Sequence, residues 1–336
     1  MEIIPAEPRP FEHMLALPQA DWLPVQFVKD PLSFAESSDH IDVATAGICL
    51  RLHFCYTNQQ ARSKEDLRAQ LAASQAGTRV LSWFLNSEYH KDMKTSRLTL
   101  LKTIAFGVVA EGSTSFLWEM LMLSHDYKRI DGTSDVGTYD LMSLGSKIVL
   151  LMSLLEAQAF WSMGSNKFNK PLESFHKAQL EPSLRSTASQ PYRWLVKCLT
   201  LADKTGIDVG RYERFVENIP NYEIRGPVFD RDLETGFLQL VHPTRLDPRK
   251  LLQIFHDAVR NRETMQQLED MSSERLKRLS RRLVYHCHHA GEMTEARFVV
   301  NTITALLHRK LSSPPTSGPV DARENVLHES SQTQSG

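Results

Sequence analysis

Hydrophobic residues recur at every third or fourth position along most of the chain, which is the spacing of one face of an α-helix. Near the C-terminus, for example, an apolar stripe is formed by Leu276, Leu279, Leu283 and Cys287. Strand-like alternation is almost absent, although the segment 41–56 fits a strand as well as a helix. The pattern therefore predicts an all-α fold. The helices are expected at 41–56, 63–75, 78–89, 96–110, 113–123, 140–163, 171–180, 191–204, 208–219, 249–260, 273–290 and 293–310.

Glycines follow several of these apolar stripes. Gly77, Gly112, Gly206 and Gly291 each stand where a helix would end, and glycine readily adopts the left-handed conformation that terminates helices. Gly77 and Gly112 are 35 residues apart, close to the period of helical-repeat arrays, but the later spacings are irregular. We therefore expect an irregular array of antiparallel helical hairpins, similar to a repeat or solenoid. A generic multi-helix bundle is the alternative.

Proline and serine content divides the chain into three parts. Residues 1–38 contain six prolines and predict an extended arm on the helical body, which spans 39–311. A long irregular connection is expected within the body at about 220–245. The tail 312–336 is rich in Ser, Pro and Gln and is expected to be disordered. The aromatic residues expected to hold the arm on the body are Phe11, Trp22, Phe27 and Phe34.

Composition narrows the class of protein. The formal net charge of −1 gives no overall attraction to nucleic acid or anionic lipid, so such a partner would need a local patch. The four cysteines form no C-x-x-C pair, which fits reduced thiols in an intracellular compartment. We expect the cytoplasm or nucleus, with the mitochondrion as an alternative although no transit peptide is legible. The apolar stretch 148–160 is interrupted by Ser153, Glu156 and Gln158, so we interpret it as a buried helix and not as a membrane span.

Candidate chemistry is sparse. The stretch "HCHH" at 286–289 suggests a metal site, but on a helix only His286 and His289 share a face. A zinc site needs three or four converging ligands, so we interpret these residues as a helix end and predict no metal. The phosphate-binding, nucleophile-elbow and zinc-protease motifs are absent, and no cofactor or catalytic residue is predicted. An enzyme is therefore not the favoured class, although a helical enzyme without a recognisable motif stays open.

A group of basic residues in the helix expected at 273–290 is the one candidate contact surface. A single acid, Glu274, accompanies them. Such a stripe can contact phosphates or an acidic protein partner, or it can be a solvated helix face. The basic residues are Arg275, Lys277, Arg278, Arg281 and Arg282.

The sequence "LVYHCHHAGEMTEA", Leu283 to Ala296, resembles the centre of a pentatricopeptide unit, where an Ala-Gly turn precedes the next helix. It is nearly as similar to a tetratricopeptide turn, with Gly291 and Ala296 on the motif positions. The pentatricopeptide resemblance implies RNA binding, but Arg281 and Arg282 occupy positions where that family reads bases with small polar residues. Contact with the RNA backbone is then expected in place of base reading.

The favoured function is a non-enzymatic binding or scaffold protein that acts mainly through contact with other proteins. The alternative is an organellar RNA-binding factor of pentatricopeptide-like type.

Overall fold

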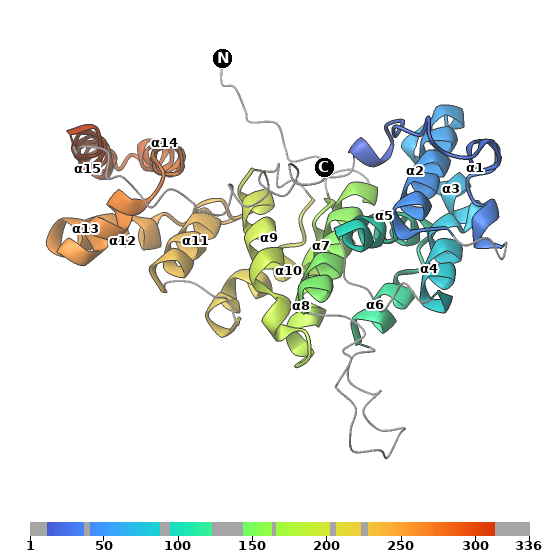
Figure 1. The fold of residues 1–336 in the computed structure, drawn as a ribbon. Helices are drawn as coiled ribbons and strands as arrows, with labels where there is room; N and C mark the ends of the chain where they lie inside the picture. The colour runs from blue at the N-terminus through green and yellow to red at the C-terminus, as the bar shows by residue number, and fades with distance from the viewer. Residues whose placement is uncertain are drawn as a thin grey trace, which may run out of the picture. The chain divides into compact units, whose positions relative to one another are not determined.

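The computed structural model describes residues 12–36, 41–87, 95–122, 144–162, 166–201, 206–222 and 228–312 (Figure 1). These ranges contain α-helices and short 3₁₀ turns and no β-strand, which confirms the all-α prediction. The chain divides into two compact units, Met1–Leu246 and Asp247–Gly336. Each unit is described separately.

Most helices of both units lie within two or three residues of the predicted ranges. In the first unit they are α1 (Val25–Lys29), α2 (Val43–Gln60), α3 (Lys64–Ser74), α4 (Ala76–Asn86), α5 (Thr95–Glu111), α6 (Thr114–Met122), α7 (Leu144–Trp161), α8 (Asn169–Leu180), α9 (Ser189–Leu201), α10 (Val209–Glu217) and α11 (Val228–Leu240). In the second unit they are α12 (Arg249–Arg260), α13 (Arg262–Asp270), α14 (Ser273–His289) and α15 (Met293–Ser312). Short 3₁₀ turns lie at Glu12–Met14, Ser33–Ala35, Arg185–Thr187 and Ile219–Asn221.

The first unit is organised around α5 and α7, which pack against each other. Helices α2, α3 and α4 also pack on α5, while α8 and α9 pack on α7. Ile104, Phe106 and Leu154 on the central pair are completely buried. Because α5 contacts helices that are distant from it in sequence, a generic multi-helix bundle fits this arrangement. The repeat arrangement is not confirmed.

The turn predicted at Gly77 was wrong, because Gly77 lies inside α4 and not between two helices. Helices α4 and α5 cross there: a Cβ atom added to Gly77 would lie 2.5 Å from the Val108 nitrogen and 2.8 Å from the Gly107 carbonyl carbon. The left-handed residue between α3 and α4 is instead Gln75, with φ of 49°. Glycine is therefore needed at position 77 for close helix approach and not for a turn.

Three other glycines adopt the predicted left-handed conformation: Gly112, Gly206 and Gly291 have φ of 81°, 80° and 78°. After Gly291, the Glu292 N–H donates to the Cys287 carbonyl at 2.8 Å, and the Gly291 N–H donates to that of His288 at 3.1 Å. This paired arrangement is the Schellman motif. Gly112 and Ser113 repeat it at the end of α5. The helix ends predicted at Gly112 and Gly291 are thus in place.

Glu111, the last residue of α5, caps the start of α4. Its carboxylate accepts the N–H groups of Gly77 at 2.6 Å and of Thr78 at 3.1 Å, and also the Thr78 hydroxyl. The first N–H groups of a helix have no partner within the helix, so a carboxylate is a suitable acceptor. Burial raises the pKa of this carboxyl, and its three hydrogen bonds oppose that rise. The capping bonds and the glycine crossing together fix α4 against α5.

Two predictions about the later helices were wrong. The segment 220–245 was expected to be irregular, but it contains α11, which begins directly after Pro227 and includes Gly236. Buried leucines at 233, 238 and 240 supply packing that offsets the helix-weakening glycine. Helix α13 was not predicted because only Leu268 on it is buried, so its apolar stripe is too short to recognise.

The expected arm contributes to the core of the first unit through two of its four aromatic residues. Phe27 and Phe34 are buried, and the Phe34 ring meets the Trp83 ring edge-on at 5.2 Å. Trp22 does not hold the arm as expected, because 58% of it is exposed. Phe11 and the expected disordered tail from 313 onward lie outside the described residues.

Helix α7 is long and apolar enough to cross a membrane, and no other described helix is. It nevertheless forms part of the central pair of the first unit, and 56% of the apolar window is buried. Trp161 near its end is buried and donates its indole N–H to the Phe106 carbonyl at 2.9 Å. We interpret α7 as a core helix.

The second unit is a smaller helical group. Helix α15 packs against α12, α13 and α14, and its most extensive contact is with α14 (Figure 1). The imidazole of His256 on α12 stacks on Phe298 at 4.2 Å, and its Nε2 lies 2.9 Å from the Glu295 carboxylate. These contacts join α12 to α15 and leave α14 as an outer helix of this unit.

Candidate functional site

The predicted basic residues lie on α14, which the sequence positions through its cap and its apolar stripe. The Ser272 hydroxyl accepts the Arg275 N–H at 3.3 Å and caps the first turn. The stripe Leu276, Leu279, Leu283 and Cys287 is buried along the whole helix, as predicted. This burial fixes which residues of α14 are directed away from the core.

The basic residues occupy the exposed side of α14. Arg275, Arg278 and Arg281 are exposed, and Lys277 and Arg282 are half-buried. Lys277 forms an ion pair with Glu274 at 3.1 Å. Neither Arg278 nor Arg281 makes an ion pair or hydrogen bond with another residue in the described part of the chain.

Tyr285 is a candidate contact residue that sequence reasoning missed. The residue is 58% exposed and lies one turn after Arg281 on the side opposite the apolar stripe. Its ring lies 3.9 Å from the His289 ring, and His289 Nδ1 is 2.8 Å from the Tyr285 carbonyl oxygen. The sequence does indicate that Tyr285 is exposed. At about 100° of rotation per residue, Tyr285 lies on the opposite side of the helix from the buried stripe. The exposed face of α14 therefore combines arginines with a positioned aromatic pair.

Apart from the Lys277–Glu274 ion pair, the basic residues of α14 repel one another. Arg275 lies in the first turn, where the helix dipole is already positive. Arg275 and Arg278, and likewise Arg278 and Arg281, are three residues apart, and such like-charged pairs each cost about 0.2–0.5 kcal/mol. The exposed face of α14 therefore carries positive charge at Arg278 and Arg281 that no described residue pairs.

The histidine and cysteine stretch does not form a ligand set among the described residues. Cys287 is completely buried, and burial raises the pKa of its thiol. The negative charges of Glu292 and Glu295 raise this pKa further. A buried thiol with a raised pKa is a poor nucleophile.

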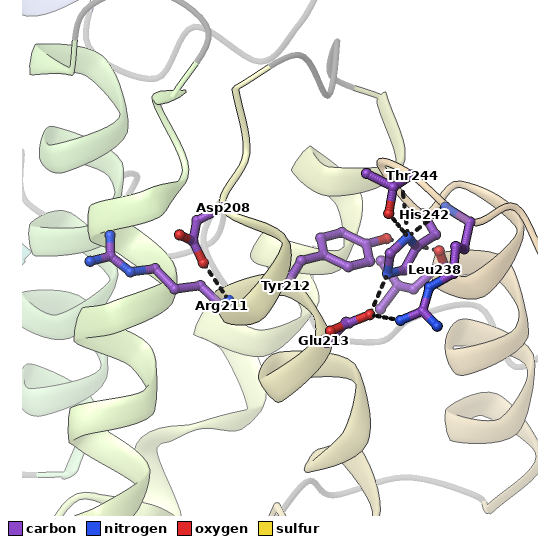
Figure 2. Close-up of polar contacts among 8 residues, drawn as sticks. Asp208, Arg211, Tyr212, Glu213, Leu238, His242 and Thr244 are labelled. Atoms are coloured by element: carbon purple, nitrogen blue, oxygen red, sulfur yellow. Dashed lines mark hydrogen bonds and ion pairs between the residues drawn. The ribbon is translucent and has the colours of Figure 1, made fainter.

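A second polar cluster lies in the first unit, just before its end, and the sequence did not indicate it (Figure 2). His242 follows α11, and only 10% of its side chain is exposed. Its Nδ1 accepts the backbone N–H groups of Thr244 at 3.2 Å and Arg245 at 3.0 Å. Its Nε2 lies 3.6 Å from the carboxylate of Glu213 on α10, which also pairs with Arg245.

Tyr212 completes this cluster. It donates its hydroxyl to the Leu238 carbonyl at 2.8 Å, and its ring meets the His242 ring edge-on at 5.2 Å (Figure 2). Asp208 caps α10 by accepting the Arg211 N–H at 2.8 Å, which positions Tyr212 and Glu213. The cluster therefore ties α10 to the turn that follows α11.

The His242 cluster is arranged for structure and not for proton transfer. A general base needs a ring nitrogen that can reach a substrate, whereas both nitrogens of His242 already face protein groups. Burial lowers the pKa of His242; Glu213 opposes this shift and Arg245 adds to it. The ring is thus held neutral, which keeps Nδ1 available as the acceptor for the turn.

No protein-family model matches the chain, and neither the curated proteins nor the solved structures contain a significant match.

Proposed function

We propose that the protein is a non-enzymatic helical binding or scaffold protein that contacts a partner protein through the exposed face of α14. The observation that carries this proposal is the exposed Tyr285 beside Arg278 and Arg281, which make no ion pair with the described residues. Arginine and tyrosine are enriched among the residues that supply most of the energy of protein interfaces. Arginine also binds carboxylates through two parallel hydrogen bonds, which adds geometric specificity.

The test compares proteins captured by the full chain with those captured by two charge-reversed variants. Arg278→Glu/Arg281→Glu changes the proposed surface. Arg260→Glu/Arg262→Glu makes the same charge change at exposed positions of α12 and α13 in the same unit. We expect the first variant to lose a defined set of crosslinked partners that the second retains. An identical set for both variants would show that the α14 face is not the binding surface.

Single-stranded RNA is a second candidate partner, favoured by the Tyr285–His289 ring pair beside the arginines. Aromatic rings stack on bases, and arginines neutralise phosphates with an affinity that falls as salt rises. Fluorescence anisotropy with a labelled single-stranded RNA oligonucleotide tests this candidate. If RNA is the partner, the affinity for the oligonucleotide falls steeply from low to moderate salt. The Arg278→Glu/Arg282→Glu variant also binds the oligonucleotide more weakly. Binding that is absent or independent of salt would exclude RNA.

A further inference from the structure

The exposed line of α14 has the spacing of a helix-pairing seam. Glu274, Arg278, Arg281, Tyr285 and His288 follow one another at intervals of four, three, four and three residues, and all five are exposed. A repeat of 3.5 residues keeps one side of a helix facing a second helix. At 1.5 Å per residue, the line is about 21 Å long. A partner helix of about four turns has the same length.

We infer that the partner segment is an acidic amphipathic helix that lies along this line, an inference that rests on the proposed function. Carboxylates one turn apart on such a helix would meet Arg278 and Arg281. An apolar side chain one turn further on would pack on the ring of Tyr285, which His289 already supports from one side. The partner's charge would also remove the repulsion between neighbouring arginines on α14.

The same line fits single-stranded RNA less well. Recognition of single strands by stacking uses several aromatic side chains, each of which receives a base. Tyr285 is the sole Phe, Trp or Tyr on α14. One aromatic residue between arginines and histidines is the pattern of a single apolar anchor within an ionic interface.

The experiment uses the full chain and two synthetic 18-residue peptides of identical composition. In the first peptide, glutamates and one leucine share a single helix face; in the second, the same residues are distributed around the helix. We expect the first peptide to bind at least tenfold more tightly by fluorescence anisotropy. Tyr285→Ala and Arg278→Glu/Arg281→Glu should each weaken it, while Arg260→Glu/Arg262→Glu leaves it unchanged.

The alternative outcomes show whether this inference fails alone or together with the proposed function. Equal binding of the two peptides, sensitive to Arg278→Glu/Arg281→Glu, would overturn the helical partner and retain an acidic protein partner. Binding of a single-stranded RNA oligonucleotide without peptide binding would overturn both proposals in favour of RNA. Peptide binding that is unaffected by all the α14 variants would place the contact elsewhere and would also overturn both.

Discussion

Alanine at Gly77 tests the central helix crossing of the first unit. The added Cβ would lie 2.5 Å and 2.8 Å from backbone atoms of α5, whereas carbon contacts are optimal at about 3.5–4.0 Å. Since backbone atoms cannot rotate away, α4 and α5 must separate locally by about 1 Å. Overpacking of this kind costs about 3 kcal/mol, and the weakened charge-assisted bond from Gly77 to Glu111 costs about 1 kcal/mol more. Alanine's better helix propensity returns about 1 kcal/mol, which leaves a net loss of about 3 kcal/mol.

The assay is urea unfolding followed by tryptophan emission. All five tryptophans lie in the first unit, so this signal reports on that unit alone. With a slope of about 2 kcal/mol per molar urea, the midpoint should fall by about 1.5 M.

Gly47→Ala is the matched control for Gly77→Ala. It also replaces a buried helical glycine, but its Cβ would meet nothing closer than 3.9 Å. We expect it to stabilise the unit by about 1 kcal/mol through helix propensity. A Gly77→Ala variant as stable as Gly47→Ala would refute the reasoning. A Gly77→Asn variant more stable than Gly77→Ala would also refute the reasoning. Asparagine adopts the left-handed conformation more readily than alanine, so this order of stability is typical of a turn glycine.

Three further predictions concern charge. Burial raises the pKa of Glu156 to about 7, so the folded state loses stability as the pH rises from about 4.5 through 7. Glu156→Gln should stabilise the first unit by up to about 3 kcal/mol at pH 8 and little at pH 4.5, and equal urea midpoint shifts at both pH values would contradict this. Burial lowers the pKa of His242, so its contribution is complete above about pH 6.5 and is lost as the pH falls below that value. His242→Asn, which keeps an acceptor for the turn but does not titrate, should reduce the loss of stability between pH 7.5 and 5; an unchanged loss would argue against the cluster. Arg278→Gln/Arg281→Gln should stabilise α14 by about 1 kcal/mol by removing like-charge pairs, seen as slower amide hydrogen exchange, whereas faster exchange would mean that the arginines support the fold.

The helical class and most helix positions followed from the sequence because burial imposes a local period of three to four residues. The stripe that ends at Cys287 and the helix end at Gly291 are both of this local kind. Gly77 shows the limit of such reasoning. A glycine needed for a tertiary crossing has the same sequence context as a turn glycine, and only the position of α5 distinguishes them. Helix α11 was missed for the same reason, since its burial depends on contacts with α9 and α10.

The two polar clusters, the basic residues of α14 and the His242 cluster, also differ in whether a local sequence pattern indicates them. The basic residues of α14 were recognisable because they lie close together on one helix, and the apolar stripe alone determines that they are directed outward. The His242 cluster combines residues that are about 30 positions apart in sequence, so no local pattern announces it. In that cluster every charged group has a partner, as expected where selection favours stability. On α14, Arg278 and Arg281 are like charges three residues apart at a cost to the helix, and that cost is the physical reason for proposing the binding surface there.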